Sequence, residues 1–232
     1  MTDSPDTRPT GPTPLDSSIT PMIAALSFGA RLFSRAVTRV SVEGALDEIP
    51  REGPVIIAAN HASNLDAVVL GSWLIPKIGR RFQWLGKKEL FAWPVVGYIA
   101  RHGGVHPVDR SKADVEAYRL AKRILDEGHV LFVFPEGTRS PDGLVHRFKA
   151  GSFLLALEAG LTIVPLSISG SRSVMRKGQL ATRPGHVMFQ VHEPVAAPRI
   201  DTPTIADARD LAVRIEQIVR SGVYTGHVSH ER

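Results

Sequence analysis

Cysteine is absent from this chain of 232 residues. Disulfide bonds, thiolate–metal sites and a covalent cysteine mechanism are therefore excluded. The Gly-x-Ser-x-Gly elbow of serine hydrolases is missing too, and no recognisable metal-ligand motif replaces it, so we expect no metal site. These absences argue against hydrolysis of a lipid ester or phosphate, which stays open as an alternative function.

Long apolar runs are also missing. No stretch of about 18 uncharged apolar residues occurs, and the sequence therefore predicts no transmembrane helix. Residues 1–16 are rich in proline, threonine and aspartate, and they lack the basic and apolar regions of a secretory signal. We expect a disordered tail over residues 1–16, followed by a single domain over residues 17–232.

Aromatic residues make up only 6% of the chain, whereas positive charge is in excess and gives a net charge of +5. Such a balance favours an anionic partner, namely nucleic acid, a phosphorylated ligand or an acidic membrane. The basic residues are scattered, and no base-stacking pattern accompanies them. We therefore expect no binding of nucleic acid.

The first strong periodicity predicts a helix over residues 19–40, where apolar residues recur at alternating spacings of four and three. Arg31, Arg35 and Arg39 recur every fourth residue, which places them roughly opposite the apolar stripe. Such a helix can lie on an anionic bilayer with its arginines toward the headgroups. It can equally pack on the domain with its arginines solvated, and the two arrangements are compatible.

Short apolar segments then alternate with helical ones. The segments expected to form strands are 54–59, 81–85, 130–134, 162–168 and 186–191. The segments expected to form helices are 66–74, 112–127, 150–160 and 204–221. Segments 54–59 and 130–134 are apolar throughout, as expected of strands that helices cover on both faces. The sequence predicts an α/β fold whose central, mostly parallel or mixed sheet is flanked by helices, with an N-terminal amphipathic helix.

A polar cluster at Asn60–Asp66 follows the first buried strand. In open α/β sheets, ligands gather at the carboxyl ends of strands. His61 is suited to act as a general base toward an alcohol, with Asp66 fixing the tautomer of the imidazole. Because Ser63 lies too near in sequence to be an obvious nucleophile, we favour direct attack by a substrate hydroxyl. The alternative is that His61 and Asp66 are loop caps, with Asp66 serving the following helix.

A second polar cluster, Pro135–Ser140, follows the strand at 130–134. If the two strands are parallel, both clusters open onto the same edge of the sheet. Gly137 permits backbone conformations closed to other residues, and Arg139 offers a planar fork for phosphate oxygens. Glu136 could orient that arginine or accept a substrate hydroxyl. The alternative is a turn that carries an ordinary surface salt bridge between arginine and glutamate.

A third segment, Gly104–Arg110, ends in another candidate phosphate ligand, Arg110. On its own this segment does not indicate a functional site. His106 within it is expected to be a bystander, because a lone loop histidine is more often structural than catalytic.

Taken in order, these segments resemble the four sequence blocks of the glycerophospholipid acyltransferase family, in particular the 1-acylglycerol-3-phosphate acyltransferases. The matching residues are Asn60-His61 with Asp66 for the first block, Gly104 and Asp109-Arg110 for the second, Phe134–Ser140 for the third and Thr162–Ile168 for the fourth. The resemblance spans roughly residues 42–195. It departs from the family at His106 and Pro107, where the second block commonly carries aliphatic residues.

The resemblance implies an O-acyltransferase. Such an enzyme moves a fatty acyl group from acyl-CoA, or from an acyl carrier protein thioester, to the free hydroxyl of 1-acylglycerol-3-phosphate, giving phosphatidic acid in phospholipid synthesis. No cofactor beyond the thioester co-substrate is implied. Another lysophospholipid or polar acceptor is the alternative. An anionic membrane surface is the implied partner, and the cytoplasmic face of the cell membrane is the implied, peripheral location.

The family's functional residues transfer position by position. His61 would take the proton from the acceptor hydroxyl and Asp66 would orient it. Lys87 would stabilise the oxyanion, unless it is an ordinary surface lysine. The residues implied to bind the acceptor are Arg110, Glu136, Gly137, Thr138 and Arg139.

Overall fold

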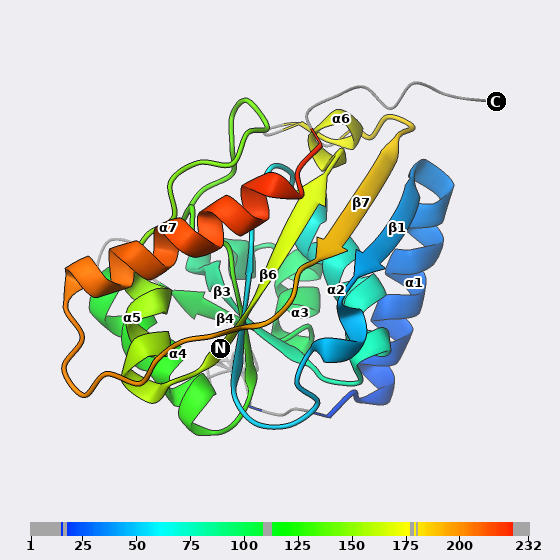
Figure 1. Ribbon diagram of the computed structural model, residues 1–232. Coiled ribbons are helices and arrows are strands. Elements are labelled where there is room, and N and C mark those ends of the chain that lie inside the picture. Colours follow the sequence, from blue (N-terminus) through cyan, green and yellow to red (C-terminus); the bar gives the residue numbers. More distant parts are fainter. Residues whose placement is uncertain (1–14, 16–17, 109–112, 177–178, 180, 225–232) are drawn as a thin grey trace, which may run out of the picture.

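The computed structural model describes residues 15, 18–108, 113–176, 179 and 181–224. Its strands are β1 (Arg39–Gly44), β2 (Val55–Ala59), β3 (Phe82–Lys87), β4 (Val105–Val108), β5 (Val130–Val133), β6 (Thr162–Ser169), β7 (His186–Val191) and β8 (Val195–Ala196). They form one eight-stranded sheet in the order β1-β7-β6-β2-β5-β3-β4, with β8 paired to β6 (Figure 1). β6 runs antiparallel to β7 and β8, whereas the other pairs are parallel. The predicted mixed sheet is thus confirmed.

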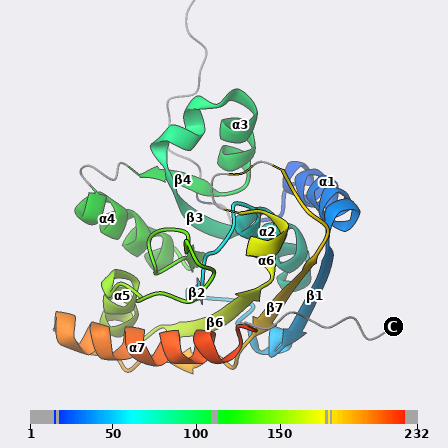
Figure 2. The same cartoon turned by 90° about the horizontal axis from the view of Figure 1, so that it is seen from above.

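Helices lie on both faces of this sheet. The α-helices are α1 (Pro21–Val37), α2 (Leu65–Ile78), α3 (Pro94–His102), α4 (Ala113–Asp126), α5 (Gly151–Ala159), α6 (Ser171–Val174) and α7 (Ile205–Ser221), and the 3-10 helices are η1 (Leu46–Glu48) and η2 (Lys88–Ala92). α1 and α2 lie on one face of the sheet, and α4, α5 and α7 lie on the other (Figure 2). Side chains of α1 and α2 enter one hydrophobic cluster, and those of α4, α5 and α7 enter the other. The sheet separates the two clusters, so the architecture is the predicted α/β sandwich.

The central strand β2 shows why its sequence is apolar throughout. Val55, Ile57 and Ala59 face one hydrophobic cluster, while Ile56 and Ala58 face the other. All five are fully buried. Because β2 is parallel to both β5 and β6, the carboxyl ends of these strands meet at one edge of the sheet. The polar clusters that follow β2 and β5 therefore share this edge, as the sequence predicted.

The N-terminal helix is shorter than predicted. α1 ends at Val37, and Thr38 is extended, with φ −157° and ψ 155°. Arg39 lies in β1 and pairs with His186 of β7. The Thr38 hydroxyl donates to the Gly185 carbonyl at 2.7 Å, which ties the end of the helix to the sheet. The helical prediction to residue 40 is wrong because tertiary strand pairing overrides the local period.

The predicted placement of the arginines is also wrong. Arg31 Nε donates to the Ser72 carbonyl of α2 at 2.8 Å. The guanidinium carbons of Arg31 and Arg35 lie 5.3 and 5.4 Å from the centre of the Trp73 ring, so both arginines rest against α2. The exposed large side chains of α1 are instead Met22, Phe28, Leu32 and Phe33. The outer face of α1 is therefore largely apolar. Within the described ranges no helix is long and apolar enough to cross a bilayer.

Candidate active site

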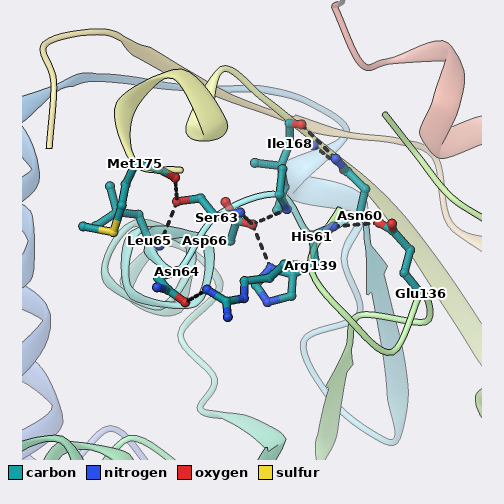
Figure 3. Close-up of polar contacts among 11 residues, drawn as sticks. Asn60, His61, Ser63, Asn64, Leu65, Asp66, Glu136, Arg139, Ile168 and Met175 are labelled. Carbon is teal, nitrogen blue, oxygen red and sulfur yellow. Dashed lines mark hydrogen bonds and ion pairs between the residues drawn. The ribbon is translucent and has the colours of Figure 1, made fainter. Parts of the chain in front are cut away.

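The loops that follow β2 and β5 are joined through the backbone of His61 (Figure 3). The His61 N–H donates to Glu136 Oε1 at 2.8 Å, and the His61 carbonyl accepts from the Ser140 N–H at 2.7 Å. One residue of the first loop is thus held from both sides by the second loop. Two segments about 75 residues apart in sequence form a single polar site.

The His61 and Asp66 side chains form a direct pair. His61 Nδ1 lies 2.8 Å from Asp66 Oδ2, and the Asp66 side chain is fully buried while that of His61 is 19% exposed. With Nδ1 engaged by the carboxylate, the proton rests on Nδ1 and the remaining nitrogen, Nε2, is left as an acceptor. Nε2 has no hydrogen-bond partner among the described residues. A carboxylate, an oriented imidazole and an open nitrogen are the arrangement that deprotonates a hydroxyl.

Asp66 also shapes the loop, but it does not cap the following helix as the alternative interpretation proposed, because the N-cap of α2 is Asn64. Asp66 Oδ2 accepts from the backbone N–H groups of Ala62 and Ser63, both at 2.8 Å. The same oxygen therefore fixes the backbone next to His61 and the ring of His61. The ring is held further by stacking on Phe134, with centroids 4.0 Å apart and planes at 15°. These contacts leave the imidazole little freedom to rotate.

The Glu136 carboxylate links the loop that follows β2 to the segment that carries His146. It accepts from the N–H of His61 at 2.8 Å and from that of His146 at 3.2 Å. Burial raises the pKa of the Glu136 carboxyl, while these two N–H groups act in the opposite direction. The salt bridge to Arg139 that the sequence left open is not formed, because both oxygens of Glu136 face backbone N–H groups.

Arg139 reaches across to the other loop. Its guanidinium donates to Asn64 Oδ1, at the start of α2 and three residues from His61. Gly137 has φ +72°, a backbone conformation that favours glycine, and a Cβ there would lie 2.9 Å from Lys149 Cε. The lysine stem therefore packs where Gly137 has no side chain. Thr138 is exposed on the same turn.

Two further residues belong to the site predicted from the sequence, namely Lys87 and Arg110. Lys87 is exposed at the carboxyl end of β3, on the same sheet edge as His61, but β5 lies between β3 and β2. Arg110 lies outside the described residues. The geometry thus brings together His61, Asp66, Glu136, Gly137, Thr138 and Arg139, and it places Lys87 at the border of the site.

Two residues of the first loop have roles that the sequence did not reveal. Asn60 is buried, donates to the Ile168 carbonyl at 3.0 Å and accepts from the Ile168 N–H at 2.7 Å, which extends the β2–β6 pairing by one residue. Ser63 is fully buried, and its hydroxyl donates to the Met175 carbonyl at 2.8 Å. Ser63 is therefore held as a structural donor, which agrees with a reaction that needs no serine nucleophile.

His106 lies inside the fold rather than at the site. It is buried in β4, and its Nε2 lies 2.7 Å from Gln83 Oε1. Burial first, and neighbouring positive charges second, lower the pKa of His106 to about 4. The histidine is therefore neutral near pH 7 and packs as a structural side chain.

A pH-dependent stability follows from His106. The unfolded chain binds this proton near pH 6.5 and the folded chain only near pH 4, so the free energy of unfolding falls as the pH is lowered through that interval. Urea midpoints of the wild type and His106→Gln, measured at several pH values, should show a weaker pH dependence in the variant. Equal losses of stability in both proteins would assign the effect to other groups.

The fold and the site together define an α/β protein with a histidine–carboxylate pair at the carboxyl edge of a mixed sheet, beside a cationic turn. The sequence profile of the family described as Acyltransferase matches residues 39–169. This segment is more than half of the chain and contains both site loops. The chain belongs to the acyltransferase family.

Individual relatives agree with this family. The chain is 30% identical to a chloroplastic 1-acyl-sn-glycerol-3-phosphate acyltransferase of Arabidopsis thaliana, over 75% of this chain and 50% of that protein. It is 31% identical to a lyso-ornithine lipid O-acyltransferase of Pseudomonas aeruginosa, over 80% of this chain and 75% of that protein. The crystal structure of the 1-acyl-sn-glycerophosphate acyltransferase of Thermotoga maritima has a similar fold, with a TM-score of 0.72 at 28% identity, covering 86% of this chain and 77% of that one. The chain spans about half the length of the first curated relatives it matches.

Proposed function

We propose that the protein transfers a fatty acyl group from a thioester, of coenzyme A or of acyl carrier protein, to the free hydroxyl of 1-acylglycerol-3-phosphate, giving phosphatidic acid. The observation that carries this proposal is the His61–Asp66 pair, whose contact of 2.8 Å leaves Nε2 open beside a cationic turn. The names of the Arabidopsis and Thermotoga relatives support the phosphorylated acceptor.

The reaction needs few groups because a thioester is already an activated acyl donor. His61 Nε2 takes the proton of the acceptor hydroxyl while its oxygen forms a bond to the thioester carbonyl carbon. The tetrahedral oxyanion then expels the thiolate, which takes the proton from the imidazolium and leaves as the thiol. Asp66 steadies the imidazolium during this cycle, and Lys87 is proposed to balance the oxyanion charge.

The phosphate of the acceptor is assigned to the turn that carries Gly137, Thr138 and Arg139, together with Arg110. Glu136 contributes by holding this turn against the backbone of His61, so its proposed role is to position the site. A phosphate bound there would hold the acceptor near His61, because Arg139 already contacts the loop that carries this residue.

Replacement of Arg139 should weaken acceptor binding. Because a hydrogen bond to a charged group contributes about 1.5–3 kcal/mol, Arg139→Ala should raise the apparent KM for 1-acylglycerol-3-phosphate about 10- to 100-fold and leave the KM for the thioester near its wild-type value. Steady-state kinetics with each substrate varied in turn measure both constants. Arg209→Ala, an exposed arginine of α7, is the matched control, and an unchanged acceptor KM in Arg139→Ala would remove this residue from the phosphate site.

The proposed location is the cytoplasmic face of the cell membrane, with peripheral attachment to anionic lipid. The acceptor and the product are membrane lipids, and the outer face of α1 presents Phe28 at 71% and Leu32 at 64% exposure. An apolar helix face of this kind stabilises binding by burial in the headgroup region.

A second acceptor class is supported by the Pseudomonas relative, because this chain covers 75% of that lyso-ornithine lipid acyltransferase. The deciding experiment offers the purified protein labelled acyl-CoA with 1-acylglycerol-3-phosphate, lyso-ornithine lipid or a neutral lysolipid, and identifies the products by mass. Labelled phosphatidic acid as the main product supports the proposal. Labelled ornithine lipid as the main product would replace the acceptor, and free fatty acid alone would replace the reaction class.

A further inference from the structure

The connection between β3 and β4 carries a group of exposed apolar side chains that the proposed reaction does not use. They belong to η2 and α3 and are Leu90 (43% exposed), Trp93 (62%), Val96 (39%), Tyr98 (47%) and Ile99 (44%). We call these five residues the η2–α3 surface. Large exposed apolar patches on folded domains often mark sites that bind another protein, a ligand or a membrane.

The backbone of this connection explains why the large side chains point outward. A Cβ on Gly97 would lie 2.6 Å from the carbonyl oxygen of Phe91, so the backbone of α3 packs directly on that of η2. The small residues Gly97 and Ala100 fill the inner side of α3. Trp93, Val96 and Ile99 recur every third residue and share the outer side. All three side chains therefore keep a large exposed fraction.

The η2–α3 surface continues into the apolar face of α1. Tyr98 Oη lies 4.0 Å from Met22 Sδ, and α1 contacts α3 (Figure 2). The exposed side chains Phe28 and Leu32 extend the same apolar region along α1. The two helices are far apart in sequence, and η2 begins directly after β3, at the carboxyl edge of the sheet that also holds His61.

The charges around this surface fit an anionic lipid layer. Between Lys87 and His102 the chain carries Lys87, Lys88 and Arg101 against a single acidic residue, Glu89, which gives this segment a formal charge of +2 with neutral histidine. Basic residues in the same segment, together with an exposed tryptophan and tyrosine, match the composition of elements that lie in the interface of a bilayer.

We propose that the η2–α3 surface inserts into the headgroup region of an anionic bilayer, as a second contact beside α1, and presents the sheet edge with His61 to the membrane. With nine residues, α3 is about 14 Å long, too short to span a bilayer, so it lies in the plane of the interface. The inference deepens the proposed function, because a lysolipid acceptor then reaches His61 directly from the layer.

Trp93 provides the test, because it is the most exposed of the three tryptophans of the chain: Trp84 is 7% exposed and Trp73 is partly buried. The intact protein is mixed with vesicles of phosphatidylglycerol and phosphatidylcholine, and its emission is compared with that in vesicles whose acyl chains carry bromine. We expect a blue shift and quenching by the brominated lipid, both absent in Trp93→Phe. An unshifted, unquenched Trp93 emission in vesicles that bind the protein would overturn the proposal.

A matched pair of variants tests the energetic contribution. Val96→Glu/Ile99→Glu should weaken vesicle binding at least about tenfold, because the variant places two charges where apolar side chains enter the lipid. The control Ile205→Glu/Val213→Glu changes the same residue types at similar exposure on α7, and it should bind as the wild type does. Equal binding of both variants would show that α1 alone holds the membrane and would overturn the inference.

Activity separates this inference from the proposed reaction. On a short-chain acceptor dispersed as monomers, Val96→Glu/Ile99→Glu should turn over like the wild type, and on acceptor within vesicles its rate should fall with its binding. If all proteins fail to transfer acyl groups to either form while Trp93 still enters the vesicles, the reaction assignment fails and the membrane surface stands. A Trp93 shift with acyl carrier protein and none with vesicles would assign the surface to that protein instead, against our proposal.

Discussion

His61→Ala is expected to lose a factor of about 10² to 10⁴ in turnover, since this is the typical contribution of a general base. The imidazole is the side chain whose free nitrogen faces the proposed hydroxyl, with its other nitrogen 2.8 Å from Asp66. The change removes a side chain that is 19% exposed and keeps the backbone bonds of residue 61 to Glu136 and Ser140. Initial rates of phosphatidic acid formation, at saturating concentrations of both substrates, measure the loss.

The control for this variant is His186→Ala, which removes an exposed histidine whose ring contacts Ser41 in β1. It should keep the wild-type rate. Both variants should unfold in a single transition near the wild-type urea concentration, because neither histidine belongs to a hydrophobic cluster. A folded His61→Ala protein with nearly normal turnover would refute the assignment of the base.

Asp66→Asn is expected to have the second-largest effect. Its Oδ2 accepts three hydrogen bonds, from the His61 ring and from the N–H groups of Ala62 and Ser63. If the amide oxygen keeps these bonds, a neutral group no longer stabilises the imidazolium. If the amide nitrogen turns toward the ring instead, it forces the unproductive tautomer. Either outcome should lower kcat by about 10² to 10⁴.

The split between kcat and KM distinguishes this loss from a structural one. In Asp66→Asn kcat should fall while the KM values of both substrates stay near the wild-type values, because the change removes a charge and keeps the size of the side chain. Asp126→Asn is the matched control, with the same change at an exposed carboxylate that pairs with Lys122. An Asp66→Asn protein with nearly normal kcat would show that Asp66 supports only the loop.

The sequence predicts the central fold well because its strands follow simple rules. Val55–Ala59 and Val130–Val133 are apolar throughout, and both are central strands buried on two faces. The polar residues that follow them share one edge because the strands are parallel, so His61 and Glu136 could be brought together from sequence alone. The hydrogen bond from the His61 N–H to the Glu136 carboxylate shows that the two loops meet, as the parallel strands predicted.

Other elements depend on contacts that a local period does not encode. Arg39 and Val40 continue the helical pattern of α1, yet they begin β1, which pairs with β7 about 150 residues further along the chain. α3 is not predicted from the sequence because it is a helix of only nine residues that begins at Pro94, contains Gly97 and turns its apolar side outward. The inward orientation of Arg31 depends on the Ser72 carbonyl of α2, which no pattern within α1 can indicate.

The candidate active site likewise combines features that the sequence predicts with features that it does not. The residue types at 61, 66 and 139 reveal the chemistry, because imidazole, carboxylate and guanidinium have few substitutes for base catalysis and phosphate binding. The supporting contacts are invisible in sequence: the ring of Phe134 under His61 and the bonds between Asn60 and Ile168 arise only when β2, β5 and β6 lie together. Positions can thus be predicted from chemistry, whereas their rigidity is a property of the assembled sheet.

The most direct test measures thiol release from acyl-CoA and ester formation in the same reaction, with and without 1-acylglycerol-3-phosphate. Direct attack by a hydroxyl that His61 activates predicts one phosphatidic acid for each thiol released, and almost no thiol when the acceptor is omitted. Thiol release at the same rate without the acceptor, accompanied by free fatty acid, would contradict the account.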